Sequence, residues 1–330
     1  MTLPVVLTGA SGFIGSAVLR RLAGHEGTEV RALVRRRLPL PARVEQVRAD
    51  LASPETLRGV CSGARVLVHA ASYVGSDEEL CTRVNDQGTA HLLSEARRAG
   101  VERVVQLSTT AVYGRGPHHG AAVGDLRPDP GSPASRSRLA GEEHALREEA
   151  AGEGALRDGA VVLRAGLVTG DGDRWVVPAL AELARRVPGY WRGGEALLSL
   201  IDVDDLARVT VRAALQPYED AAGGSSRAVR GVHHAVHPVP VRNRDLMDTL
   251  AGLGLLPPVR GELTWRECAG LLERHPGRVS ERQLRLLAFD HHYATTLWEA
   301  CESAPGRGPL AALADAAPWY RRHLAQTADG

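Results

Sequence analysis

Glycines at positions 9, 12 and 15 constrain the fold of this chain more than any other feature. They lie between the apolar run Val5-Val6-Leu7 and a stretch of helical pattern from Ser16 to Ala23. In a strand-to-helix turn of this kind, the first glycine permits the tight bend, the second lets the backbone approach a pyrophosphate, and the third allows close packing of helix on strand. The positive helix N-terminus then faces the phosphates. We therefore predict a dinucleotide site built from Thr8, Gly9, Ser11, Gly12, Phe13, Ile14 and Gly15.

The first 110 residues alternate short apolar runs with amphipathic stretches of helical length. This alternation predicts βαβ units. The predicted strands are nearly continuous in apolar residues, which favours a parallel sheet covered on both faces. We expect an α/β protein with a Rossmann-type, doubly wound parallel sheet. The predicted strands are Val5–Leu7, Glu29–Val34, Arg65–His69, Val104–Leu107, Ala160–Leu167 and Leu198–Val203, with helices over Asn85–Ala99 and from about Asp204.

The remainder of the chain predicts a second, smaller unit. Residues 114–135 are rich in Gly, Pro, His and Asp and are expected to form a long loop, with helical pattern resuming at Arg138. Residues 171–197 and 231–330 mix Trp, Pro and Arg with short helical patterns. We expect these two segments to form a C-terminal substrate-binding cap. Residues 1–170, with 198–230 returning to them, would form the NADP-binding domain.

Charge and composition exclude several classes of protein. Forty basic residues against 39 acidic ones give a net charge of +1, without the broad basic field of a nucleic-acid-binding protein. No apolar stretch reaches the roughly 18 residues of a membrane span, and no secretory leader is recognised, so we expect a cytoplasmic monomer or homodimer. The four cysteines are widely spaced, which predicts no disulfide framework and no zinc site. Every basic residue is arginine, and the chain contains no lysine.

The end of the second predicted strand indicates which nicotinamide nucleotide the site prefers. An NAD site usually places an acidic residue there, to accept a hydrogen bond from the ribose 2′-hydroxyl. Here Val34 is followed by Arg35, Arg36 and Arg37. A guanidinium can pair bidentately with a 2′-phosphate, so we predict NADP(H), held by Arg35 and Arg36. Asp50 is placed to contact the adenine amino group.

Several further motifs, in the order found here, make the chain resemble the extended short-chain dehydrogenase/reductase superfamily, which includes nucleotide-sugar epimerases, dehydratases and 4-ketoreductases. The resemblance covers most of residues 3–245. It implies cofactor contacts by Asp50, Leu51, His69, Ala70, Ala71 and Arg138. The motifs are Thr8–Gly15, Asp50-Leu51, His69-Ala70-Ala71, Asn85, Ser108–Gly114, Ser137–Glu142, Arg164 and Val203–Ala207.

The catalytic positions implied by the resemblance are only partly filled. The family uses a Ser or Thr, a Tyr and a Lys, the last two spaced YxxxK. Matching the motifs places the hydroxyl at Thr109, with Ser108 beside it, the tyrosine position at Ala134 and the lysine position at Arg138. No tyrosine occurs between Tyr113 and Tyr190, so no shift of the alignment restores the pair. A missing general acid costs about 10²–10⁴ in rate, whereas positioning contributes more, so hydride transfer remains feasible.

The proton must then come from another source. Three remain open: the Thr109 hydroxyl through water, a side chain near the long loop (Ser108, Ser135, His118 or His119), or an acidic group of the substrate. A phenol next to the substrate ketone would supply an internal proton. Aromatic residues are few, and those expected to contact a flat, apolar small-molecule substrate are Tyr73, Tyr113, Trp175, Tyr190 and Trp191.

These observations lead to three hypotheses. The first is an NADPH-dependent ketoreductase acting on a polycyclic aromatic polyketide, as in antibiotic biosynthesis; the lysine-free, arginine-rich composition resembles that of actinomycete proteins. The second is a catalytically silent NADP-binding sensor or regulator. The third is a nucleotide-sugar epimerase, dehydratase or 4-ketoreductase, chemistry that relies on the absent tyrosine.

Overall fold

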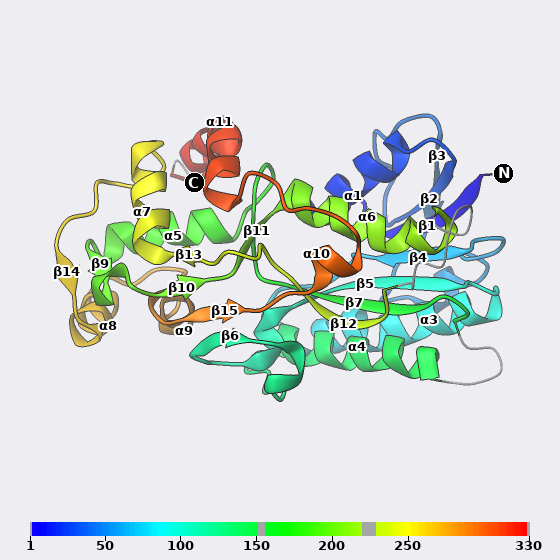
Figure 1. Ribbon diagram of the computed structural model, residues 1–330, viewed down its shortest axis with the longest axis horizontal. Coiled ribbons are helices and arrows are strands. Elements are labelled where there is room, and N and C mark those ends of the chain that lie inside the picture. Colours follow the sequence, from blue (N-terminus) through cyan, green and yellow to red (C-terminus); the bar gives the residue numbers. More distant parts are fainter. Residues whose placement is uncertain (1, 151–155, 220–228, 329–330) are drawn as a thin grey trace.

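A seven-stranded parallel sheet forms the larger half of the molecule in this computed structural model, which describes residues 2–150, 156–219 and 229–328 (Figure 1). The strand order is β12-β7-β5-β4-β1-β2-β3, with all six pairings parallel. The predicted doubly wound α/β sheet is thus confirmed. Its strands are β1 (Leu3–Thr8), β2 (Thr28–Val34), β3 (Val44–Arg48), β4 (Val66–His69), β5 (Arg103–Thr109), β7 (Gly159–Ala165) and β12 (Gly231–Ala235).

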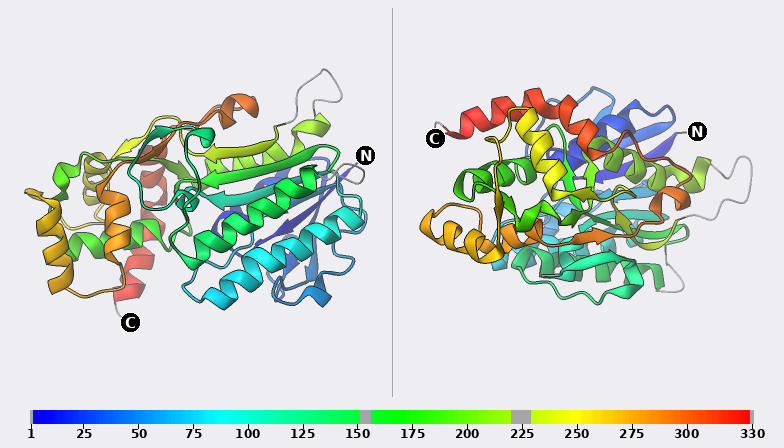
Figure 2. Two further views of the ribbon diagram at one scale, coloured as in Figure 1. Left: turned by 90° about the horizontal axis from the view of Figure 1, so that it is seen from below. Right: turned by 60° about the vertical axis from the view of Figure 1, so that its left-hand side comes forward.

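Helices cover both faces of this sheet, as its apolar strands require (Figure 2). On one face, α1 (Phe13–Gly24) packs beside α6 (Val203–Glu219), and their apolar sides join the largest hydrophobic core. On the other face, α3 (Gly88–Arg98) and α4 (Pro133–Ala150) cover a second core. Strands β4, β5 and β7 are buried along almost their whole length.

The smaller half has its own hydrophobic core and lies at one end of the large sheet (Figure 1). Its main sheet has the order β13-β10-β15-β6. A buried polar contact joins its C-terminal helix to residues just after β8: the Tyr320 hydroxyl donates to Asp173 at 2.9 Å and accepts from the Gly170 amide. The helices of the smaller half are α5 (Val176–Arg186), α7 (Asn243–Gly252), α8 (Trp265–Arg274), α9 (Glu281–Ala288) and α11 (Pro309–Ala328). Helix α10 (Leu297–Ala300) instead packs into the core of the large sheet through Leu297 and Trp298. The remaining strands are β6 (His118–Ala121), β8 (Leu167–Thr169), β9 (Tyr190–Trp191), β10 (Leu197–Leu198), β11 (Leu200–Asp202), β13 (Val241–Arg242), β14 (Glu262–Leu263) and β15 (His291–Tyr293).

Two predicted helix starts were wrong. Helix α4 begins at Pro133 and not at Arg138, because the Ser132 hydroxyl accepts the Ser135 amide as an N-cap and Pro133 takes the first helical position. The helix expected from Asn85 is preceded by α2 (Glu78–Cys81) and a π-helical stretch from Thr82 to Gln87, since Asp77 caps Leu80.

The predicted loop over residues 114–135 and the predicted start of the cap at residue 231 also need correction. The loop expected over residues 114–135 contains β6, which pairs with β15. The cap expected from residue 231 begins later, because β12 pairs with β7 and extends the large sheet. Strand β3 was not predicted. Its residues are only partly apolar, because it lies at the edge of the sheet.

All four cysteines are free and buried. Among the helices of the described residues, none has the length and apolar character needed to cross a membrane.

Candidate functional site

A cavity of about 260 Å³ opens at the carboxyl ends of β1, β2, β3 and β4. This edge is where ligands bind in open α/β sheets. The cavity brings together residues from four separate sequence motifs. Its predicted members are Thr8, Gly9, Ser11, Gly12, Arg35, Asp50, Leu51, Ala70, Ala71 and Tyr73. The predicted contacts Phe13, Ile14, Gly15, Arg36, His69 and Arg138 are not on its wall.

The glycines of the first turn leave space where phosphates would lie. A Cβ on Gly9 would come within 2.7 Å of the Ala70 and Ala71 backbone, and one on Gly15 within 2.0 Å of the Gly9 carbonyl oxygen. A Cβ on Gly12 would meet only the Gly9 oxygen, at 3.2 Å, so its outer side is open. Gly12 is the N-cap of α1 and provides no side chain to satisfy the first amides. These amides are free to bind an anion.

His69 lies behind the cavity wall and hydrogen-bonds to Thr8 and Thr89. The Thr8 hydroxyl accepts the Ala70 and Ala71 amides and therefore donates its own hydrogen to His69 Nδ1, at 2.7 Å. His69 Nε2 then donates to Thr89 at 3.0 Å. Burial, together with the nearby Arg138, lowers the pKa of His69 to about 4, so the ring is neutral. His69 thus positions the β1 and β4 ends rather than touching the cavity.

Arg35 and Asp50 both line the cavity wall. Arg35 follows β2 with an exposed side chain, next to Leu33 and Val34 on the same wall. Asp50 Oδ1 accepts the Ala52 amide at 2.9 Å, and the Thr56 hydroxyl accepts the Asp50 amide. Asp50 is therefore held in place, whereas the Arg35 guanidinium is free to move toward an anion.

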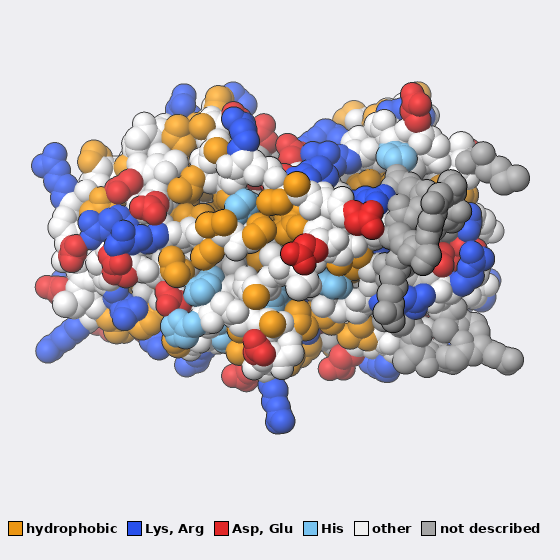
Figure 3. All heavy atoms as spheres, viewed as in Figure 1, with side chains coloured by type: hydrophobic (Ala, Val, Ile, Leu, Met, Phe, Trp, Pro, Cys, Tyr) orange, Lys and Arg blue, Asp and Glu red, His pale blue; other side chains and the backbone are white. Residues whose placement is uncertain are grey.

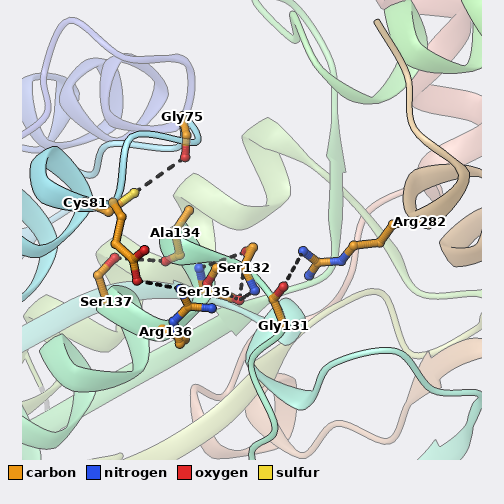
Figure 4. Close-up of polar contacts among 10 residues, drawn as sticks. Gly75, Cys81, Gly131, Ser132, Ala134, Ser135, Arg136, Ser137 and Arg282 are labelled. Atoms are coloured by element: carbon orange, nitrogen blue, oxygen red, sulfur yellow. Dashed lines mark hydrogen bonds and ion pairs between the residues drawn. The ribbon is translucent and has the colours of Figure 1, made fainter. Parts of the chain in front are cut away.

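Helix α4 carries Ala134 and Arg138, the positions that the resemblance matches to the family tyrosine and lysine. Figure 4 shows Ala134 among Ser132, Ser135 and Ser137. Asn85 ties this region to the cavity: it bonds both backbone polar groups of Tyr73, at 2.7 and 2.8 Å, and donates to Ser137 at 3.0 Å. Ala134 brings no hydroxyl to this place. Ser135 is committed to Ser132, so it is not a free proton donor.

Arg138 presents an unused hydrogen-bond donor. Its Nε is buried and has no partner among the residues that the structure describes. Burial lowers the pKa of Arg138 to about 10, against the opposing effect of Glu142. An arginine with this pKa is still charged at neutral pH. The guanidinium therefore stays charged, with one buried donor that no described residue satisfies.

The two predicted hydroxyls at the end of β5 differ in their freedom. Ser108 is buried and donates to the Glu142 carboxylate, which Arg164 also contacts at 2.6 Å. Thr109 is only half-buried and accepts the Ala111 amide at 3.2 Å. Because its oxygen is the acceptor in that bond, the bond leaves the hydroxyl hydrogen of Thr109 unused, although Thr109 itself does not line the cavity. Ser108 instead belongs to the core.

Tyr113 continues the buried network away from the cavity. Its hydroxyl accepts from Arg164 at 2.7 Å and donates to His234 Nε2 at 2.7 Å, while His234 Nδ1 faces the Ala294 carbonyl. Burial lowers the pKa of His234 to about 4 and raises that of Tyr113. Tyr113 is therefore a structural residue, contrary to the prediction that it contacts substrate.

Of the other aromatic residues predicted to contact substrate, one lines the cavity and three do not. Tyr73 lies on the cavity wall. Trp191 is fully buried in the core of the smaller half and donates to Val187, so its predicted ligand contact is wrong. Trp175 is 62% exposed at the start of α5, and Tyr190 bonds Asp248. Neither lines the cavity.

His118 and His119 lie on β6, and neither lines the cavity. His118 is buried against Tyr113 and Tyr293, and His119 is paired with Asp290 at 2.8 Å. Sequence reasoning missed the roles of Asn85, Glu142, Arg164 and His234. The first three lie in the family motifs, which was the available signal; His234 has no local signal, because its partner Tyr113 is 121 residues away.

Comparisons with known proteins show what this chain is similar to. The structure resembles MoeE5 in complex with UDP-glucose and NAD, with a TM-score of 0.70 and 26% identity over 97% of this chain and 99% of that one. A 2-alkyl-3-oxoalkanoate reductase of Stenotrophomonas maltophilia is 31% identical over 55% of this chain and 56% of its own length. A putative dihydroflavonol 4-reductase of Synechocystis is 26% identical over 96% of this chain and 94% of its own.

Several other curated relatives match over about a third to a half of their own length. The sequence pattern of the NAD dependent epimerase/dehydratase family matches residues 5–226. This chain therefore belongs to the NAD dependent epimerase/dehydratase family.

Proposed function

We propose that this chain is an NADP(H)-dependent ketoreductase that reduces a ketone of a polycyclic aromatic, angucyclinone-like polyketide in natural-product biosynthesis. The observation that carries the proposal is the Thr109 hydroxyl, half-buried at the end of β5 with its hydrogen free for a carbonyl oxygen. The names of two relatives, an oxoalkanoate reductase and a dihydroflavonol reductase, support carbonyl reduction.

The residues around the cavity fit an NADP(H) molecule. Ser11, Gly12 and the uncapped amides of α1 would hold the pyrophosphate. Arg35 would pair with the 2′-phosphate, and Arg138, at the position that matches the family lysine, would hold the nicotinamide ribose. When bound, the nicotinamide supplies the hydride. Tyr73 offers an aromatic face on the same wall for a planar substrate.

The source of the proton is what distinguishes this site from the family pattern. Ala134 supplies none, Ser108 is committed to Glu142, and Tyr113 is committed to His234. Thr109 would hold the carbonyl oxygen by its hydroxyl, in the manner of an oxyanion donor. A phenol adjacent to the ketone would then pass its proton to the developing alkoxide. The substrate class we propose is therefore an aromatic hydroxy-ketone.

Two other functions have support from particular observations. The commitment of Ser108 and Tyr113 within the core would suit an NADP-binding sensor without turnover. The likeness to MoeE5 bound to UDP-glucose would suit nucleotide-sugar chemistry. The latter is disfavoured because Ala134 stands where the family tyrosine acts.

The experiment is to follow loss of NADPH absorbance with purified protein and three substrates: an aromatic ortho-hydroxy-ketone, its methyl ether, and a UDP-sugar. We expect oxidation of NADPH with the phenol and at least tenfold slower oxidation with the ether. Equal rates with phenol and ether would remove the substrate-assisted proton. Tight NADPH binding with no oxidation by any ketone would support the sensor. Conversion of the UDP-sugar to an epimer or a dehydrated product consumes no net NADPH, so it is followed by chromatography, and it would support epimerase or dehydratase chemistry.

A further inference from the structure

Two pairs of histidines lie side by side on adjacent strands, outside the nucleotide cavity. Strands β6 and β15 are parallel, with His118 opposite His291 and His119 opposite His292. Alternation along a strand sends successive side chains to opposite faces. His118 and His291 are accordingly buried, whereas His119 is exposed and His292 half-buried. Figure 3 shows histidine side chains on the surface over these two strands.

A carboxylate completes this surface group. Asp290 Oδ2 lies 2.8 Å from His119 Nδ1, and one ligand atom from each of His119, Asp290 and His292 lies within 4.8 Å of the other two. Asp290 Oδ1 accepts the Leu197 amide of β10 at 2.8 Å, which fixes the carboxylate plane. Outer hydrogen bonds of this kind orient the ligands of metal sites.

The contact between His119 and Asp290 does not explain why His292 lies beside them. Within the described parts of the chain, the ring nitrogens of His292 have no hydrogen-bond partner. The His292 ring packs near the His119 ring, with 6.4 Å between the two ring centroids. Gly120 keeps the space beside this ring open, because a Cβ there would lie 3.4 Å from His292 Cε1. Two imidazoles and a carboxylate converge here, with one imidazole unused.

We propose that His119, Asp290 and His292 bind a divalent transition-metal ion of the zinc class, with water in the remaining coordination positions. Imidazole and carboxylate are ligands that Zn²⁺ accepts at about 2.0–2.2 Å. The three ligand atoms lie within 4.8 Å of one another, close enough for a single ion to bind between them. The ion would replace the His119–Asp290 hydrogen bond. The prediction of no zinc site considered cysteine spacing and missed this group, because His119 and Asp290 are 171 residues apart.

Such an ion would join two distant segments of the chain. His119 belongs to the segment between β5 and α4, and the other two ligands belong to β15 and the residue before it. A ligand that binds only the folded state stabilises that state by mass action. The site stands apart from the nucleotide cavity, so the proposal does not depend on the proposed reductase activity.

The test is zinc titration of untagged, chelator-treated and dialysed protein by calorimetry, with thermal unfolding in parallel. We expect one Zn²⁺ per chain and a higher unfolding midpoint with zinc than without. His119→Ala and His292→Ala should each weaken binding at least tenfold and abolish the shift in midpoint. His275→Ala, which removes an exposed histidine elsewhere in the smaller half, should change neither.

Cobalt provides a second readout, since Co²⁺ bound by two imidazoles and a carboxylate gives visible d–d absorption that free histidines do not. The His119 side chain is 64% exposed, so its truncation leaves the fold intact even if His292→Ala does not fold. Wild-type protein that takes up no Zn²⁺ at millimolar concentration would overturn the proposal. Undiminished binding by His119→Ala would do the same.

Discussion

The Thr8 hydroxyl donates to Nδ1 of His69 across 2.7 Å, and this bond fixes which nitrogen of the histidine carries the hydrogen. Thr8 already accepts two backbone amides, so its single hydrogen goes to the ring, and the ring hydrogen goes from Nε2 to Thr89. Protonation of His69 would set two hydrogens against each other at Nδ1. The ends of β1 and β4, which form the cavity floor, therefore depend on a neutral histidine.

This arrangement predicts acid sensitivity of the fold. The pKa of His69 falls from 6.5 to about 4 on folding, so the unfolded chain binds an extra proton between these values. Stability should be retained above pH 6.5 and decline as the pH falls toward 4, by about 1.4 kcal/mol per pH unit for this residue. Urea unfolding of wild type and His69→Gln, measured across that range, tests this. The variant should be less stable at neutral pH and show a shallower slope, while the exposed His275→Gln should follow wild type. Parallel slopes for wild type and His69→Gln would contradict the prediction.

Gly15, in the first turn of α1, can be tested against Gly24, at the end of the same helix. A Cβ on Gly15 would lie 2.0 Å from the Gly9 carbonyl oxygen, whereas one on Gly24 meets nothing within 4 Å. Gly15→Ala should therefore cost about 1–3 kcal/mol of unfolding free energy and weaken NADPH binding. Gly24→Ala should leave binding unchanged and alter stability by less than about 1 kcal/mol. Chemical denaturation and NADPH fluorescence measure the two effects. Normal cofactor affinity in Gly15→Ala would show that the turn does not hold the pyrophosphate.

Arg35 is the residue that should discriminate between the two nicotinamide nucleotides. A charge-assisted pair with the 2′-phosphate contributes about 1.5–3 kcal/mol, so Arg35→Glu should weaken NADPH binding by more than tenfold. Binding of NADH, which lacks that phosphate, should change little. Arg37→Glu provides the control, since it makes the same charge change on an exposed side chain outside the cavity wall. Equal losses for both nucleotides would mean that Arg35 does not read the 2′-phosphate.

Thr109 should affect the chemical step more than binding. Thr109→Val keeps the shape of the side chain but removes the hydroxyl that we propose holds the carbonyl oxygen. Loss of one such donor lowers kcat by about 10²–10³, with NADPH affinity preserved. Single-turnover rates together with NADPH titration separate the two quantities. Thr82→Val, on a half-buried threonine at the end of α2, controls for the substitution itself. A variant with wild-type kcat would assign the carbonyl contact to another group.

The large sheet and its glycine turn could be predicted from local sequence, because strand and helix periodicity and the demands of a phosphate-binding turn act over a few residues. The start of α4 carried a local signal as well, because a serine N-cap at Ser132 followed by Pro133 at the first helical position is typical of a helix start. Edge strand β3 lacked a signal, since only one of its faces needs apolar residues.

What the tertiary structure decided is which side chains reach the site. The sequence by itself determined that no lysine exists and that no tyrosine stands between Tyr113 and Tyr190. Only the fold showed that Tyr113 hydrogen-bonds to His234, that Ser108 hydrogen-bonds to Glu142, and that Trp191 is buried in the core. Hydrogen-bond commitment and burial depend on partners that are distant along the chain. The same reason places His119 beside Asp290 and His292, a grouping that exists only once β6 and β15 are paired.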